Sequence, residues 1–198
     1  MFSKLKEFLK TKLSDFAEKR QARLVLFLHS FIDSSVIPVT VDISFVPIAI
    51  ARPKRAFQFA FWTSLGSVLG CLFAYLIGSA MMEVIGFRII ELFNLQPQWL
   101  QLIEAVEGEV ANITIAVAAI TPLSFTLAGF AAGAVKMDFS SFFVIALIFR
   151  TLRFILLSFL IYYFGAAVKT FLDRYYNTLA GIFLWVTVLT LIIIIFVL

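Results

Sequence analysis

The stretch FIDSSVIPVTVDISFVPIAIARP, residues 31–53, decides the fold of this chain. It is apolar enough for a bilayer, yet it carries Asp33 and Asp42 and contains Pro38 and Pro47. A carboxylate inside a membrane is costly, and a proline interrupts the backbone hydrogen bonds of a helix. Such a segment is tolerated at membrane depth only where it is buried in protein or lines a wet cavity. The stretch therefore predicts a broken helix pair at the centre of a transport site.

The composition places the whole chain in the membrane class. Of its 198 residues, 62% are hydrophobic and 14% are charged, whereas soluble domains have about 45–50% apolar and about 25% charged residues. The length leaves room for a single membrane domain, residues 24–198, and for no sizeable soluble module. The sequence has one cysteine and shows no metal-ligand cluster, nucleotide-binding glycine loop or nucleophile–base pair. We therefore expect no cofactor, no metal and no enzymatic activity, with an intramembrane enzyme as a distant alternative.

The charge distribution indicates the topology. Residues 1–23 hold seven basic and three acidic side chains, which accounts for the entire net charge of +4. Their apolar residues share one helical face, which predicts an amphipathic helix in the membrane interface, with a solvated cytoplasmic tail as the alternative. Because basic segments stay in the cytoplasm, we expect the N-terminus there. No basic stripe with interleaved aromatic residues is present, so nucleic-acid binding is not expected.

Residues 24–51 could form one kinked span or a hairpin that returns to its own side. Each half has about ten residues, whereas a spanning helix needs about 20. Arg52, Lys54 and Arg55 follow directly, and basic loops also stay in the cytoplasm. With both flanks on one side of the membrane, the re-entrant hairpin is favoured.

Residues 57–82 predict a spanning helix with one smooth face. Small residues recur at every fourth position of it: Gly66, Gly70, Ala74 and Gly78. In lipid, such a face lets the backbone of another helix approach closely. The acid-rich segment 83–109 is then expected to form amphipathic helices at the external surface.

Residues 111–135 repeat the theme of the first stretch. Two short apolar runs flank Pro122, and Thr121 and Ser124 lie beside this proline. We interpret the segment as a second re-entrant hairpin that enters from the external side, with these three residues at its tip.

Two arginines lie within the next expected span, residues 139–168. Arg150 is 11 residues beyond Phe139, which is about 16 Å of helix and near the middle of a hydrocarbon core about 30 Å thick. Arg153 shares its face of the helix. A last span is expected at residues 178–198, which leaves the C-terminus outside.

The two halves of the chain resemble each other weakly. Pro38 and Pro122 each precede a run that ends at a basic residue and is followed by a span. Because the two hairpins are expected to enter from opposite sides, the repeat would be inverted, as in many secondary transporters. The predicted fold is an all-α integral membrane protein with two opposed re-entrant helical hairpins and about three spanning helices.

Asp33, Asp42, Arg150 and Arg153 form the candidate site. Each costs about 2.5–3.5 kcal/mol at the bilayer centre. In one interpretation they are two ion pairs that fasten the first hairpin to residues 139–168, in a membrane-organising protein that transports nothing. In the other, the arginines bind an anionic lipid head group, because guanidinium pairs well with phosphate, and the aspartates carry protons.

Two long stretches carry a family resemblance. The sequence DSSVIPVTVDISFVPIAIARPKRAFQFAFWTSLGSVLGCLFAYLIG, residues 33–78, resembles the first half of the DedA superfamily (the SNARE-associated or VTT domain), specifically its YqaA-like branch. The sequence TPLSFTLAGFAAGAVKMDFSSFF, residues 121–143, followed by FRTLRF and YYFG, resembles the second half. The resemblance covers roughly residues 30–168.

The resemblance implies two opposed re-entrant loops and a flippase or scramblase of phospholipids or polyprenyl phosphates in the bacterial cytoplasmic membrane. The family's two acidic positions match Asp33 and Asp42. The basic residues that the family carries around its second proline are missing beside Pro122. Arg150 and Arg153 are candidates to replace them, and the departure weighs against polyprenyl phosphates while leaving lipid scrambling open. The expected partners are lipids with anionic head groups and protons. The sequence is also compatible with a homo-oligomer.

Overall fold

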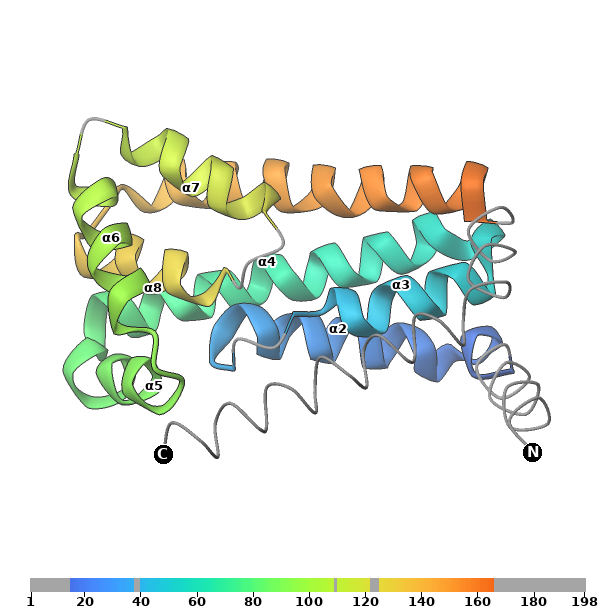
Figure 1. Cartoon of the computed structure of the whole chain (residues 1–198), viewed down its shortest axis with the longest axis horizontal. Coiled ribbons are helices and arrows are strands. Elements are labelled where there is room, and N and C mark those ends of the chain that lie inside the picture. The colour runs from blue at the N-terminus through green and yellow to red at the C-terminus, as the bar shows by residue number, and fades with distance from the viewer. Residues whose placement is uncertain (1–14, 38–39, 109, 122–124, 166–198) are drawn as a thin grey trace, which may run out of the picture.

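A computed structural model describes residues 15–37, 40–108, 110–121 and 125–165. Every regular element in this part of the chain is helical (Figure 1). Several predictions lie outside the described residues: most of the amphipathic helix at 1–23, the last span at 178–198, and the loop-tip residues Pro38, Pro122 and Ser124.

The first hairpin consists of α2 (Arg20–Ser35) and α3 (Asp42–Ala51). α2 runs to the middle of the molecule, and α3 returns to the end from which α2 started (Figure 1). Glu18 forms an ion pair with Arg52, and its carbonyl oxygen accepts a hydrogen bond of 2.9 Å from Arg55 Nη1. Both flanks of the hairpin therefore lie at one end of the molecule, as the charge pattern predicts. Its re-entry into a bilayer leaflet stays a prediction.

The proline at position 47 does not break this hairpin. We expect a break at Pro47 from the sequence, but α3 continues through it to Ala51. The missing N–H removes one backbone hydrogen bond of a short helix. Burial of the α3 side chains offsets this loss, because Phe45 is fully buried with its ring 5.5 Å from that of Phe154.

Two helices form the long axis of the molecule. A 3₁₀ turn, η1 (Pro53–Arg55), leads into α4 (Ala56–Ala80), and the second long helix comprises Phe139–Gly165. Both are long and apolar enough to cross a membrane. Their exposed side chains are large and apolar at many positions, including Phe61, Leu76 and Phe159. Large apolar surfaces of this kind indicate contact with lipid or protein rather than water.

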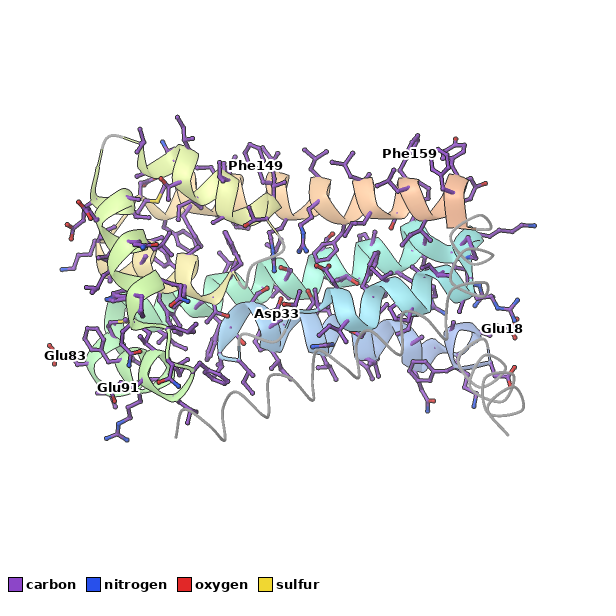
Figure 2. All side chains as sticks on the ribbon, in the orientation of Figure 1. Glu18, Asp33, Glu83, Glu91, Phe149 and Phe159 are labelled. Atoms are coloured by element: carbon purple, nitrogen blue, oxygen red, sulfur yellow. The ribbon has the colours of Figure 1, made fainter. Side chains whose placement is uncertain are left out.

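The acid-rich segment lies at the end opposite the flanks of the first hairpin. It forms the π-helix η2 (Met82–Gly86), α5 (Phe87–Leu92) and α6 (Gln96–Glu107). Figure 2 shows Glu83 and Glu91 at this end, Glu18 at the other end, and Asp33 between them. The molecule thus has an acidic end and a basic end, with Asp33 in its middle.

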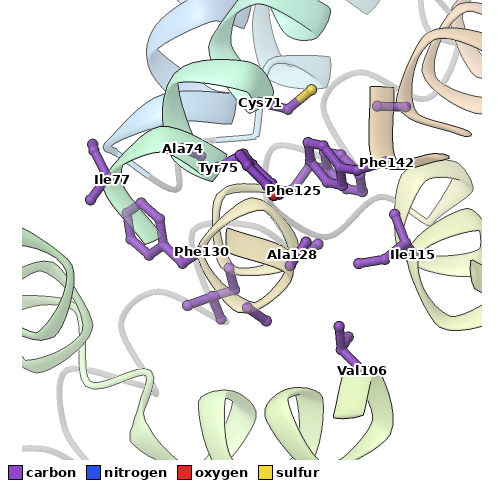
Figure 3. Packing of buried hydrophobic residues seen from close by; sticks show 14 of the residues in the cluster. Cys71, Ala74, Tyr75, Ile77, Val106, Ile115, Phe125, Ala128, Phe130 and Phe142 are labelled. Atoms are coloured by element: carbon purple, nitrogen blue, oxygen red, sulfur yellow. The ribbon is translucent and has the colours of Figure 1, made fainter. Parts of the chain in front are cut away.

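The second hairpin consists of α7 (Ala111–Ile120) and α8 (Thr126–Ala134), which run in opposite directions (Figure 1). It opens toward the acidic end, whereas the first hairpin opens toward the basic end. Figure 3 shows Phe125, Ala128 and Phe130 packed with Tyr75 and Phe142 in the core around this hairpin.

A tight turn connects the second hairpin to the last described helix. Lys136 adopts a positive φ of 53°, and the Tyr75 hydroxyl donates a hydrogen bond of 2.6 Å to the carbonyl oxygen of Met137. The next residue, Asp138, caps the helix because its Oδ2 accepts a hydrogen bond of 2.7 Å from the backbone N–H of Ser141. This bond stabilises the carboxylate and lowers the pKa of Asp138.

One face of α4 carries both hairpins end to end. A Cβ added at Gly66 would lie 2.2 Å from the carbonyl oxygen of Phe27 on α2, and one added at Gly70 would lie 2.4 Å from that of Phe31. At Gly78 the distance would be 2.2 Å to the carbonyl oxygen of Phe130 on α8. No side chain fits in these gaps, so the glycines allow the backbones of both hairpins to touch α4.

Replacement of Gly66 by alanine should destabilise the protein. The added methyl group would push against the backbone of Phe27, which cannot rotate away, and overpacking of this kind costs about 1–3 kcal/mol. Gly108→Ala is the matched control, since a Cβ there has its nearest neighbour at 3.8 Å. Thermal unfolding of both variants in the same detergent would check the prediction. Equal Tm values for Gly66→Ala and Gly108→Ala would contradict the close backbone contact between α2 and α4.

Candidate functional site

The tips of the two hairpins meet in the middle of the molecule. The Thr126 hydroxyl, in the first residue of α8, donates a hydrogen bond to the backbone carbonyl oxygen of Asp33 near the end of α2. Both residues are at most 2% exposed. The hydrogen bond brings the two tips into contact. The polar side chains around it form one buried cluster, to which α4 and helix 139–165 also contribute residues.

Arg150 lies at the centre of this cluster and is completely buried. Its Nε donates a hydrogen bond of 2.6 Å to Ser67 Oγ on α4, and its Nη2 donates one of 2.7 Å to Ser34 Oγ on α2. The two serine hydroxyls are 2.8 Å apart and share a hydrogen bond. The Oδ2 atom of Asp33 lies 3.5 Å from Arg150 Nη2 and forms an ion pair with it. A single guanidinium thus connects three helices.

Arg153 forms the second ion pair, one turn further along the same helix. Its Nη2 donates a hydrogen bond to Oδ2 of Asp42. Asp42 is the first residue of α3, where the helix dipole favours a negative charge. The side chain of Asp42 is 22% exposed, compared with 3% for Asp33. Asp42 is therefore the acid with better access from outside the cluster.

Aromatic rings surround both guanidinium groups. The Arg150 guanidinium carbon is 5.1 Å from the ring centre of Phe125 and 5.7 Å from that of Phe154, and the Arg153 guanidinium carbon is 5.3 Å from the latter. Each contact is a cation–π interaction, which is stronger away from water. Phe125 belongs to the tip of the second hairpin and stacks on Phe142. Among the described residues, this hairpin brings an aromatic ring to Arg150 and a hydroxyl to the carbonyl oxygen of Asp33, but no charge.

Some polar atoms of the cluster have no hydrogen-bond partner among the described residues: Arg150 Nη1, Asp42 Oδ1, Ser30 Oγ and Ser64 Oγ. A buried donor without a partner loses its hydration free energy, which costs about 1–3 kcal/mol and more for a charged group. An anion beside Arg150 would satisfy its Nη1. Two guanidinium groups on one helix face, one of them with an Nη1 that has no partner among the described residues, can chemically bind a phosphate or a carboxylate.

The structure brings together all four ionisable residues proposed from the sequence. Of the proposed tip residues, Thr121 lies within the described part, and its hydroxyl donates a hydrogen bond of 3.0 Å to the carbonyl oxygen of Ala118 in its own helix. Sequence reasoning missed Ser34, Ser67 and Phe125 as partners of Arg150. The sequence shows only that each serine lies within a largely apolar segment, and which helix face meets the arginine becomes known from the structure.

The first hairpin is also closed by a side-chain contact. His29 Nδ1 on α2 lies 2.6 Å from Ser44 Oγ on α3. The Ser44 hydroxyl also forms a hydrogen bond of 3.0 Å with the carbonyl oxygen of Val41. Within the described ranges, no group of three His, Cys, Asp or Glu residues is placed to hold a metal ion.

Comparisons with known proteins give a family and two relatives. The model of the VTT domain matches residues 32–163, a range that contains the end of α2, the whole of α3, the second hairpin and both arginines. An uncharacterized protein of Haemophilus influenzae is 26% identical over 147 residues, which are 74% of this chain and 76% of the relative. A protein of Histophilus somni, also described as uncharacterized, is 27% identical over the same shares of both chains. No solved structure matches the chain significantly.

Proposed function

The chain belongs to the VTT domain family of membrane proteins, and from this premise we propose that it is a flippase or scramblase of lipids with anionic head groups. The buried pair of guanidinium groups at the meeting point of the hairpins carries the proposal. The family resemblance points to lipids, and the arginines select for an anionic group on them. The basic end would face the cytoplasm of a bacterial cell, in agreement with the charge rule for membrane loops.

The proposed head-group site lies between Arg150 and Arg153. Leucines in their places would hold the helices together without the cost of intramembrane charge. Arg150 uses its Nε and Nη2 for protein partners, while its Nη1 has none among the described residues. A phosphate oxygen would accept a hydrogen bond from Nη1, and a second oxygen would reach Arg153, since charge-assisted bonds to phosphate are strong and often bidentate.

Asp42 would respond to the arrival of the head group. A phosphate next to Arg153 competes with Asp42 for the same guanidinium. We propose that Asp42, once displaced, is the group that takes up the proton, because it has lost its cation and is the more accessible of the two acids. Release of the lipid would reverse both steps. In this proposal proton uptake accompanies head-group binding, and the more exposed acid performs it.

A second candidate function rests on the same ion pairs. Both arginines have a carboxylate partner, as expected if the charges only fasten the hairpin to helix 139–165. The protein would then organise the membrane or its partners and would move no lipid. Buried ion pairs are weak evidence of such a role, because apolar residues of similar volume often stabilise a protein as well or better.

A translocation assay with purified protein tests the proposal. Liposomes would contain the protein and a trace of fluorescent phosphatidylglycerol, and dithionite added outside would bleach the outer leaflet. We expect bleaching to proceed beyond half of the signal with phosphatidylglycerol, and much less with a neutral glycolipid of the same chain length. The same measurement across pH would show whether protons take part. Bleaching that stops at the level of protein-free liposomes for every lipid would contradict the proposed transport.

A further inference from the structure

Cations from two separate segments gather at the basic end of the molecule, which Figure 2 marks with Glu18. Glu18 brings the segments together, because its carboxylate forms an ion pair with Arg52 and its carbonyl oxygen accepts a hydrogen bond from Arg55. The cations of the two segments are Lys19, Arg20 and Arg23 at the start of α2, and Arg52, Lys54 and Arg55 around η1. Within the described ranges, Arg20, Arg23 and Lys54 form no ion pair. This end of the protein therefore holds more positive charge than its own acids neutralise.

The helices α2 and α4 run side by side in the same direction and keep one register. A Cβ added at Gly66 would meet the carbonyl oxygen of Phe27, and one added at Gly70, four residues on, would meet that of Phe31, also four residues on. The ring of Phe27 also contacts the ring of Trp62 edge to face, with ring centres 6.4 Å apart. Both aromatic side chains are half-buried. They mark a seam between the two helices that faces the surroundings of the protein.

The same register places cations at the upper end of this seam. Four residues before the ring contact on both helices, Arg23 lies opposite the exposed Gln58, and seven residues before it, Arg20 lies opposite Arg55. The contacts of Glu18 with the segment around η1 show that the two helices stay together up to this level. Two guanidinium groups side by side repel each other. An anion between them would remove this repulsion and accept hydrogen bonds from both.

The surface below the cations is apolar. Leu24 and Leu28, on the outer side of α2, are 56% and 46% exposed, and the rings of Phe27 and Trp62 lie at the same depth. Tryptophan is enriched at the level where lipid head groups meet the hydrocarbon core. A soluble anion would pair with the cations and leave this apolar surface uncovered. A lipid with an anionic head group matches both parts of the seam.

We propose that this seam, formed by Arg20, Arg23 and Arg55 with Phe27 and Trp62 below them, binds one anionic phospholipid of the leaflet around the basic end. The guanidinium groups donate hydrogen bonds to the phosphate, and an acyl chain lies along the two rings and the exposed leucines of α2. The site is separate from the central pair of guanidinium groups. It binds its lipid whether or not the protein moves lipids across the membrane.

Quenching of tryptophan fluorescence by brominated lipid measures binding at this seam. In the variant Trp99→Phe/Trp185→Phe, Trp62 is the single tryptophan of the chain. This variant would be placed in phosphatidylcholine bilayers that contain increasing fractions of phosphatidylglycerol or phosphatidylcholine with bromine on one acyl chain. We expect phosphatidylglycerol to bind beside Trp62 at least about fivefold more tightly, which is the effect of one cation near an anionic lipid.

Substitutions within the single-tryptophan protein test the position of the site. Arg23→Gln should reduce the preference for phosphatidylglycerol to about twofold or less, and Arg23→Lys should keep most of it. Lys54→Gln is the matched control, since it removes the same charge at the same end of the molecule. A 3₁₀ turn has three residues, so Lys54 points about 120° away from Arg55, whose side chain faces α2. We expect Lys54→Gln to keep the preference of the parent protein.

Four results would overturn the site. Equal binding of the two lipids beside Trp62 would mean that the seam does not select an anion. An equal loss of preference in Arg23→Gln and Lys54→Gln would mean a diffuse attraction to the charged end. Absence of quenching by either lipid would mean that protein covers Trp62. Displacement of the brominated phosphatidylglycerol by soluble glycerol phosphate would mean a site for small anions and not for a lipid.

Discussion

Arg150→Ala should reduce lipid translocation to the rate of protein-free liposomes. The guanidinium of this residue is the fully buried cation of the site, and its Nη1 has no hydrogen-bond partner among the described residues. Truncating one partner of a buried charge pair costs about 2–5 kcal/mol, so we expect a loss of at least about thirtyfold in rate. The dithionite assay with fluorescent phosphatidylglycerol measures it. A rate within a factor of two of wild type would contradict the head-group role.

The same variant should also unfold more easily, which has to be separated from the loss of transport. Without Arg150, Asp33 stays buried without this cation, and breaking a buried pair in this way costs about 3–5 kcal/mol. The double variant Asp33→Leu/Arg150→Met removes both charges, and replacing a buried pair by apolar residues is often neutral or stabilising. We expect it to have a Tm close to that of wild type and no translocation. Transport by this stable double variant would show that the pair serves the fold alone.

Asp42→Asn should have the second largest effect on translocation. The change keeps the shape of the side chain but removes its charge and its ability to carry a proton. We expect translocation near background at every pH, together with a loss of about 1.5–3 kcal/mol of stability, because a hydrogen bond between two charged groups is lost. Translocation at several pH values and thermal unfolding would be measured on the same preparation. A variant that transports normally and with the pH dependence of the wild-type protein would contradict the proton role assigned to Asp42.

Exchange of Asp42 and Arg153 tests whether their ion pair only stabilises the fold. Asp42→Arg and Arg153→Asp should each lower the Tm, since each places like charges together. In the double variant the pair is restored with opposite polarity, and the stabilities should depart from additivity by about 0.5–3 kcal/mol. We expect stability to recover but not translocation, because the second guanidinium no longer lies beside Arg150. Recovery of both properties would favour the membrane-organising alternative.

The position of Arg150 along its helix and the smooth face of α4 could be predicted because both are matters of counting. Eleven residues at a fixed rise per residue place Arg150 in the middle of its helix. Glycines at every fourth position fall on one helical face, and the structure shows two hairpin backbones against it at Gly66 and Gly78. The reversal of the first hairpin followed from the positive charges on both of its flanks, and the contact of Glu18 with Arg52 shows them together.

The partners of Arg150 could not be predicted, because they depend on which faces meet. Ser34 and Ser67 are 33 residues apart in sequence, and a serine in an apolar helix has several roles until its neighbour is known. Phe125 is one of 24 phenylalanines in the chain, and nothing in the sequence distinguishes it from the others. The expectation for Pro47 failed for the opposite reason: a local rule predicted a break, and tertiary packing of α3 against helix 139–165 outweighed the lost backbone hydrogen bond.

The backbone contacts along α4 limit how this protein can move. Gly66, Gly70, Ala74 and Gly78 form notches four residues apart, which corresponds to about 6 Å along the axis. A hairpin that slides along α4 by less than one such step would drive its carbonyl groups into side chains. If the protein transports lipid as proposed, the motion that opens its centre to either leaflet would therefore have to shift a hairpin along α4 by whole steps of four residues or lift it away from α4. Since Thr126 and Asp33 connect the two tips, neither hairpin can take such a step without releasing or pulling the other.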